Sequence, residues 1–189
     1  MYNTILNIYD EPLKQCGNEY MNSGSWNNQY KCSEEDGGAH QICINNISNK
    51  TPNFSLHTGQ SNWSNKRNND NHCVCLGAWS LYNAKLKNKS KKSNVLKCDA
   101  IPKISLSKKY VQKFRPGWNV WNGIEKPNQI VHGINSLVEN CYKPNKKRRQ
   151  SEKLRRNYCK LSKNVNSLKR TKLYSELCRN KSRRRNIIR

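Results

Sequence analysis

Residues 58–82, TGQSNWSNKRNNDNHCVCLGAWSLY, mark the point at which a long polar loop gives way to apolar core. His72, Cys73 and Cys75 stand at this transition, and apolar side chains then recur with the period of an α-helix. The pattern predicts a helix over about residues 73–86. Its apolar stripe consists of Leu76, Trp79, Tyr82 and Leu86. A loop that brings thiols and an imidazole to the first turn of a buried helix is typical of the centre of a small fold.

Short strands and one further helix complete the expected body. Apolar runs at residues 5–9, 40–44 and 95–101 each end at a turn signal or a proline, and they predict strands. Residues 127–142 carry the most regular apolar stripe in the chain and predict a helix. Apolar residues make up only 34% of the sequence, against about 45–50% in typical domains, so the core must be small. We therefore expect a small single α+β domain at residues 1–142, with short strands and two to three helices.

Positive charge is concentrated at the C-terminal end of the chain. The net charge is +24, from 36 Lys and Arg against 12 Asp and Glu. Residues 143–189 alone hold 19 of these cations, with Glu152 and Glu176 as the only acids. Such an excess is typical of a segment that binds an anionic polymer, so we expect a basic helical or disordered tail that contacts nucleic-acid phosphates. The candidate contacts are Lys146, Lys147, Arg148, Arg149, Arg155, Arg156, Lys160, Lys163, Lys169, Arg170, Lys172, Arg179, Arg183, Arg184 and Arg185.

A narrow apolar seam runs through this tail. Ser151 and Glu152 indicate the start of a helix, and Thr171 indicates the cap of a last, shorter one. The seam consists of Leu154, Tyr158, Leu161, Val165 and Leu168. It would pack either on the body or on a neighbouring protein. Because cations four residues apart repel on the other faces, we expect residues 151–178 to be largely disordered alone and helical when bound.

The cysteine content bears on the cellular compartment. The chain has nine cysteines, an odd number, and its N-terminus has no secretory signal pattern. These features favour reduced thiols and an intracellular location. No apolar run approaches the roughly 18 residues of a membrane span, so we expect no membrane partner.

Several of the rarer residues recur in a known order. The matching marks are Pro12-Leu13-x-x-Cys16, His40-x-x-Cys43, and Cys73-x-Cys75 with Trp79 four residues further on. With these marks the chain resembles a small cysteine-rich family of unknown function found in bacteria, algae and large DNA viruses. The resemblance covers about residues 5–142 and implies a self-contained α+β domain. It implies no particular activity and does not reach the basic tail.

The same thiols and imidazoles offer the sulfur and nitrogen ligands that tetrahedral zinc prefers. A bound metal would also stabilise a domain with so little core. The candidate ligands are Cys16, His40, Cys43, His72, Cys73 and Cys75, with Cys32 as a further thiol nearby in the sequence. The chain has no Cys-x-x-Cys spacing, so buried structural thiols and reactive or disulfide-forming thiols stay open as alternatives.

A thiol enzyme is one of these alternatives. A cysteine at a helix N-terminus has a lowered pKa, so Cys73 or Cys75 would act as nucleophile with His72 or His40 as base. Gly-rich phosphate loops, paired carboxylates and the hydrolase nucleophile elbow are absent from the sequence.

The sequence as a whole favours a non-enzymatic, nucleic-acid-binding structural protein. Its basic tail would neutralise the phosphate backbone of RNA or DNA, with little reading of bases. Other proteins are expected partners within a larger assembly, such as a ribonucleoprotein or a virion that packages DNA. The alternative is a zinc- or thiol-dependent enzyme with a basic targeting tail.

Overall fold

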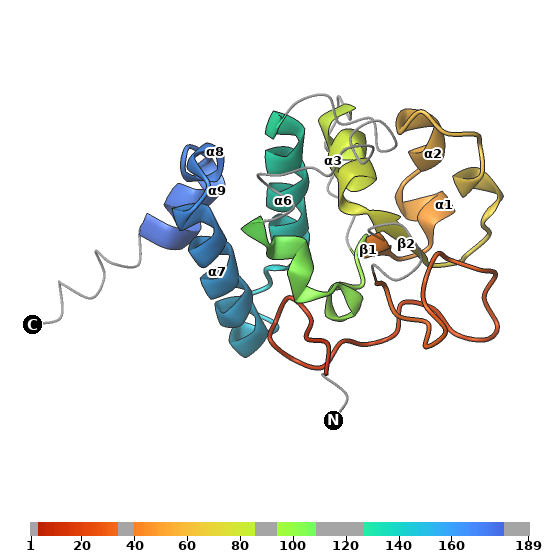
Figure 1. The fold of residues 1–189 in the computed structure, drawn as a ribbon, viewed down its shortest axis with the longest axis horizontal. Coiled ribbons are helices and arrows are strands. Elements are labelled where there is room, and N and C mark those ends of the chain that lie inside the picture. The colour runs from red at the N-terminus through yellow and green to blue at the C-terminus, as the bar shows by residue number, and fades with distance from the viewer. Residues whose placement is uncertain (1–3, 34–39, 86–93, 109–126, 180–189) are drawn as a thin grey trace, which may run out of the picture.

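A computed structural model of the chain describes residues 4–33, 40–85, 94–108 and 127–179 (Figure 1). Helices and short helical turns surround a two-stranded antiparallel sheet, so the α+β class predicted from the sequence is confirmed. Three helices, α3, α6 and α7, lie side by side across the molecule, with the sheet beyond α3. The predicted phosphate contacts Arg183, Arg184 and Arg185 lie outside the described residues.

The sheet consists of β1 (His40–Ile44) and β2 (His72–Cys75). The strand predicted at residues 40–44 is confirmed. Cys43 pairs with Cys73 and Ile44 with His72, and the register is irregular between His40 and Ile42. The connection from β1 to β2 passes through short turns of helix, α1 (Ile47–Lys50), α2 (Phe54–His57) and η1 (Ser64–Lys66).

The helix predicted over residues 73–86 begins later than expected. α3 spans Leu76–Lys85, because His72–Cys75 bond to β1 as strand β2 and leave the helix to begin at Leu76. The strands predicted at residues 5–9 and 95–101 are also corrected. They form only isolated bridges, at Leu6 to Pro12, Asn7 to Pro102 and Ile44 to Leu96. Proline has no N–H to continue a ladder, so pairing stops at the two bridges that contain Pro12 and Pro102.

The predicted helix at residues 127–142 is confirmed as α6 (Pro127–Cys141), which packs against α3. Its buried stripe consists of Ile130, Ile134, Leu137 and Val138. Gly133 allows the two helices to approach closely, since a Cβ there would lie 2.9 Å from the Ser80 Cα. The Trp79 Nε1 donates a hydrogen bond to the Gly133 carbonyl at 3.1 Å. Between these helices run two 3₁₀ turns, η2 (Cys98–Ala100) and η3 (Lys103–Leu106).

The C-terminal segment is folded onto the body. It comprises α7 (Arg148–Lys163), α8 (Asn166–Lys169), α9 (Lys172–Tyr174) and the turn η4 (Ser175–Arg179). All five residues of the predicted seam are buried in the same core cluster as α3 and α6. In the full chain residues 151–178 are therefore ordered without nucleic acid, because the body supplies the surface that the seam needs. The expectation that this segment is disordered as an isolated peptide stays a prediction.

Polar contacts fix the ends of this segment. α7 begins at Arg148 rather than Ser151, and the Ser151 hydroxyl instead accepts a hydrogen bond from the Lys143 N–H at 2.8 Å. The predicted cap at Thr171 is confirmed, since its side chain accepts from the Tyr174 N–H. The Asn157 side chain donates to the Ile8 carbonyl at 3.2 Å, which joins α7 to residues 4–33, here called the N-terminal loop.

Eight of the nine cysteines form disulfides. The pairs are Cys16–Cys43, Cys32–Cys73, Cys98–Cys141 and Cys159–Cys178. The expectation of reduced thiols is therefore corrected. Only Cys75, which is buried, takes no part in a disulfide.

Candidate nucleic-acid interface

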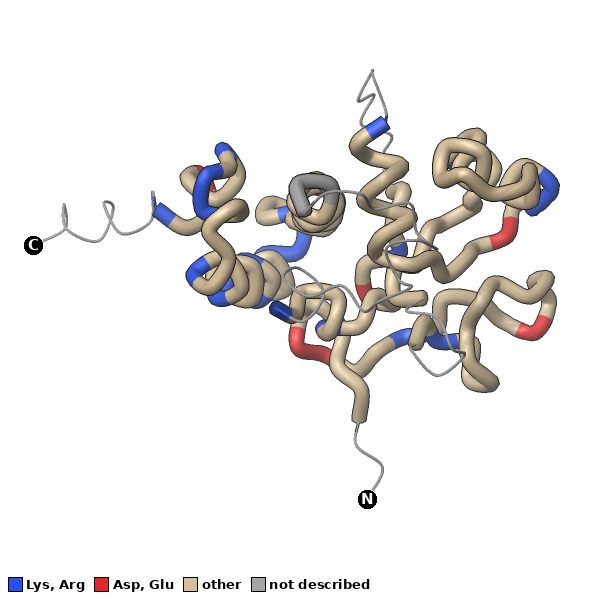
Figure 2. Tube along the Cα trace, turned by 45° about the horizontal axis from the view of Figure 1, so that its top comes forward, with Lys and Arg blue, Asp and Glu red and all other residues tan. Residues whose placement is uncertain are grey.

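The outer side of α7 and the turn before it carry exposed cations. Since the seam turns inward, residues at the complementary helical positions must face away from the core. Figure 2 shows the Lys and Arg positions gathered along this helix. We define the basic face as the exposed cations Lys146, Lys147, Arg148, Arg149, Arg156, Lys160 and Lys163. The predicted contact Arg170 is also exposed, but it lies at the C-terminal end of α8.

Other predicted contacts are engaged within the protein. Arg155 is half-buried, lies 3.1 Å from the Glu152 carboxylate, and also donates to the Leu177 carbonyl. Lys172 is exposed and pairs with Glu176 at 3.7 Å. Arg179 is also exposed and lies over the ring of Tyr174, while Lys169 is half-buried. These four contribute less charge to the surface than the sequence suggests.

The first turn of α7 holds cations where helix physics disfavours them. Lys147 is the N-cap residue and makes no side-chain capping bond, and Arg148 and Arg149 follow directly. The first turn of α7 contains no acidic residue. The positive end of a helix macrodipole favours anions by about 0.3–1 kcal/mol each, so cations there are unfavourable in the isolated protein. An anionic partner would remove this penalty.

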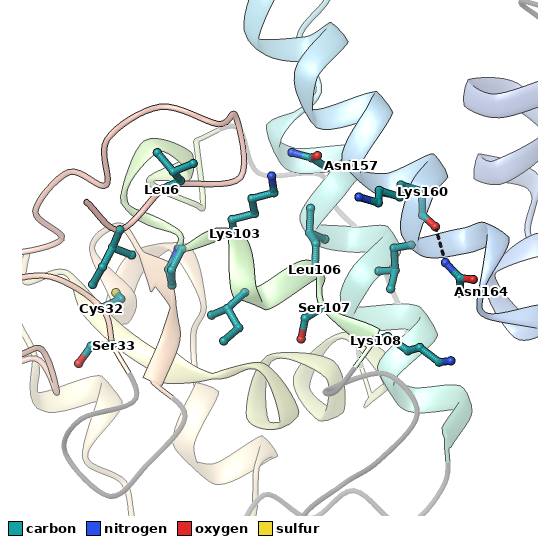
Figure 3. Close-up of a pocket in the computed structure, with 14 residues that line it drawn as sticks. Leu6, Cys32, Ser33, Lys103, Leu106, Ser107, Lys108, Asn157, Lys160 and Asn164 are labelled. Carbon is teal, nitrogen blue, oxygen red and sulfur yellow. Dashed lines mark hydrogen bonds between the residues drawn. The ribbon is translucent and has the colours of Figure 1, made fainter. Parts of the chain in front are cut away.

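A pocket of about 690 Å³ lies beside the basic face, between the N-terminal loop, η3 and α7 (Figure 3). Lys103, Lys108 and Lys160 line it, and Lys160 also belongs to the basic face. Its aliphatic lining consists of Ile5, Leu6, Pro102, Ile104, Leu106 and Leu161. The described lining includes no aromatic ring and no carboxylate. Lys103 forms an ion pair with Asp10, which lies outside the lining, so Lys108 and Lys160 are the lysines that add positive charge here. The pocket offers no ring on which a base would stack.

The predicted zinc ligands are not brought together as one set. Cys16 and Cys43 form one disulfide, and Cys73 bonds to Cys32, which is not one of the six predicted ligands. Among the described residues, the one group of three or more potential metal ligands consists of Cys16, Cys32 and Cys43. His40, His72 and Cys75 lie outside it. The spacing of the cysteines in the sequence does not indicate that Cys32 forms a disulfide with Cys73 of β2.

His72 is a buried, neutral histidine rather than a poised base. Its ring centroid lies 4.5 Å from that of Trp63, and its Nε2 lies 3.3 Å from the Ser25 hydroxyl. Burial, and then the charge of Arg67, lowers the pKa of His72 to about 3. The neighbouring Cys73 sulfur is held in a disulfide. The arrangement therefore gives no support to a Cys73–His72 nucleophile and base.

This buried imidazole predicts a specific acid sensitivity. Below about pH 6.5 the unfolded chain binds a proton at His72 that the folded chain does not bind until about pH 3. The free energy of unfolding should therefore fall by about 1.4 kcal/mol per pH unit through this window, beyond the effect of other groups. Denaturant unfolding at a series of pH values measures the slope. His72→Gln should flatten it, whereas His132→Gln, at an exposed position, should not. Equal slopes in both variants would contradict the assignment.

Comparisons with protein-family models, with curated proteins and with solved structures found no match for this chain. The resemblance to a cysteine-rich family therefore stays a prediction. Among the described helices, none combines the length and apolar content needed to cross a bilayer.

Proposed function

We propose that the protein binds nucleic acid through the basic face, as a non-enzymatic structural component of a larger assembly. The observation that carries the proposal is the uncapped start of α7, where Lys147, Arg148 and Arg149 stand together at the positive end of the helix. Cations kept at an unfavourable position point to a partner that brings negative charge.

The binding mechanism is neutralisation of phosphate. Arg156, Lys160 and Lys163 follow at helical spacings of four and three, so they align on one side of α7. Each contact with a phosphate releases condensed counterions, which makes binding favourable at low salt and weak at high salt. The pocket provides lysines but no stacking ring, which supports contact with the backbone rather than with bases.

A rigid helix also fits a structural role. Because α7 already packs on the body through its seam, binding needs no ordering of the helix and loses little conformational entropy. Three of the most exposed large aliphatic side chains, Ile5, Leu6 and Ile104, gather at the pocket. Exposed apolar groups so clustered support a further contact with a neighbouring protein of the assembly.

The proposal predicts that charge position, rather than total charge, sets the affinity. We expect the triple variant Arg156→Gln, Lys160→Gln, Lys163→Gln to bind mixed-sequence duplex DNA and RNA more weakly. On duplex DNA, the slope of log affinity against log salt should become shallower by about 0.9 for each phosphate that is no longer neutralised. Fluorescence anisotropy titrations over a range of salt concentrations measure both quantities. Glutamine favours helix, so circular dichroism should be unchanged.

A matched control removes the same charge elsewhere. The triple variant Lys50→Gln, Lys66→Gln, Lys85→Gln changes α1, η1 and α3, of which α1 and η1 lie at the opposite end of the molecule from α7 (Figure 1). It should keep nearly the native affinity and salt slope. If both triple variants weaken binding equally, the affinity is a property of net charge and the basic face is not the site. Deleting the tail would be a poorer test, because α7 belongs to the core.

A further inference from the structure

Two of the disulfides lie side by side on one face of the sheet. Cys43 and Cys73 are register partners in β1 and β2, and partners in such a pair have Cβ atoms roughly 4.5–5.5 Å apart. Each bonds to a cysteine of the N-terminal loop, Cys16 or Cys32. The sulfur atoms of Cys16, Cys32 and Cys43 all lie within 4.8 Å of one another. The fourth sulfur, that of Cys73, is bonded to Cys32, so the two disulfides form one compact group of sulfur atoms.

We propose that these four cysteines, once reduced, hold one Zn²⁺ ion as a tetrathiolate. Zinc binds thiolate sulfur at about 2.3 Å, and a tetrahedral arrangement then places the sulfurs about 3.8 Å apart. Breaking a disulfide moves its two sulfurs from bonding distance to a separation of about that size. The backbone therefore needs little change to accept the ion. The site is independent of nucleic-acid binding by α7.

The conversion balances as a reduction followed by metal binding. A dithiol reductant gives two electrons and two protons to each disulfide and is itself oxidised to a disulfide. Two such steps produce four thiols. Zn²⁺ then displaces four protons and leaves a tetrathiolate complex of charge −2. An oxidant that removes two electrons from each cysteine pair restores the disulfides and releases the ion.

The surroundings suit such a centre. All four cysteines are fully buried, which protects a thiolate complex from solvent. A cation lies beside the cluster: the Lys97 N–H donates to the Cys43 carbonyl at 3.1 Å, and the Lys97 Nζ donates to the Cys16 carbonyl at 3.5 Å. Its charge would offset part of the negative charge of the complex.

Zinc would also take over the structural role of the disulfides. Residues 13–33 form no helix or strand, and they reach the sheet through the two cysteine pairs and a few backbone bonds, such as Cys73 N–H to the Gly24 carbonyl at 2.7 Å. A loop this long needs an anchor. Reduction without metal would release it, and a bound ion would hold the same four positions together. The chain would thus have an oxidised and a reduced folded form.

Metal titration of the full chain tests the site. The protein is reduced with tris(2-carboxyethyl)phosphine under anaerobic conditions and titrated with Zn²⁺ against a chromophoric chelator. We expect one Zn²⁺ per reduced chain and none on the oxidised chain, with metal content measured by plasma mass spectrometry. Co²⁺ as a substitute should give the charge-transfer intensity of four thiolates. Circular dichroism should show that Zn²⁺ restores the structure that reduction removes.

Variants separate this site from other thiols. Cys32→Ser should lose the four-thiolate signal and weaken Zn²⁺ binding by more than the roughly 10–100-fold that outer-sphere partners are worth. Cys75→Ser, His72→Gln and the double variant Cys98→Ala, Cys141→Ala should bind Zn²⁺ as the native chain does. The proposal is overturned if the reduced chain binds no Zn²⁺, if Cys32→Ser binds it with native affinity, or if Cys75→Ser loses it.

Discussion

Tyr158→Ala is expected to lower the free energy of unfolding of the whole protein by about 3–5 kcal/mol. The Tyr158 ring is fully buried between α7 and the body. Its hydroxyl lies 3.0 Å from the Asn135 Oδ1 and 3.2 Å from the Thr171 hydroxyl, so truncation also leaves polar groups of α6 and of the Thr171 cap without this partner. Denaturant unfolding followed by tryptophan fluorescence measures the loss. All five tryptophans precede α7 in the sequence, so this signal does not arise within α7 itself.

Two control variants show whether the loss of stability comes from the buried ring. Tyr158→Phe keeps the ring and should lose only about 1 kcal/mol, the net contribution of a typical hydrogen bond. Tyr20→Ala removes a ring that is 89% exposed and should change stability by less than about 0.5 kcal/mol. If Tyr158→Ala left the tryptophan transition at the native denaturant concentration, α7 would be an independent unit and the shared core would be wrong.

The double variant Cys98→Ala, Cys141→Ala is expected to lose about 4 kcal/mol under oxidising conditions. This disulfide joins η2 to the last residue of α6 and closes a loop with a sequence separation of 43. In the chain-entropy model, a cross-link over such a loop stabilises the fold by about this amount through its effect on the unfolded chain. The denaturant midpoint, measured without reductant, gives the difference.

The Cys159–Cys178 disulfide closes a shorter loop and tests whether the loss of stability depends on loop length. Cys159→Ala, Cys178→Ala opens a loop with a separation of 19 and should lose about 3 kcal/mol by the same relation. Adding reductant to the native chain should lower its stability further than either variant, because all four pairs open. If the Cys98 and Cys141 variant were as stable as the native chain, this pair would not be a disulfide in the folded protein.

The parts of the fold that the sequence predicted are those whose signal is local. α6 has a long, regular stripe, and the cap at Thr171 depends on residues three positions apart. The sequence pattern assigns β2 to the first turn of α3, because a run as short as Cys73-Val74-Cys75 has no period of its own. Only its pairing with β1, some thirty residues earlier, decides that it is a strand.

The tail and the cysteines show what local patterns do not contain. The apolar periodicity predicts the seam from Leu154 to Leu168. Its partner is the body, and no residue of the seam indicates which surface it will cover. The composition of the tail identifies the candidate cations. Which of them are exposed depends on which side of the helix the seam buries. Disulfide connectivity is set by the three-dimensional fold, so neither the pairing of Cys32 with Cys73 nor its closeness to the other pair was predictable.

The contact between α7 and the N-terminal loop has a consequence for how the protein is made. The Asn157 to Ile8 hydrogen bond spans 149 residues and the Gln150 to Glu11 bond spans 139. Neither can form until α7 itself has left the ribosome. Until then Ile8 and the inner side of α6 lack their cover, and a nascent chain with such surfaces exposed is prone to aggregate. Folding of the body is therefore completed only when α7 docks on it, and chains that stop before α7 should be retained by chaperones or degraded.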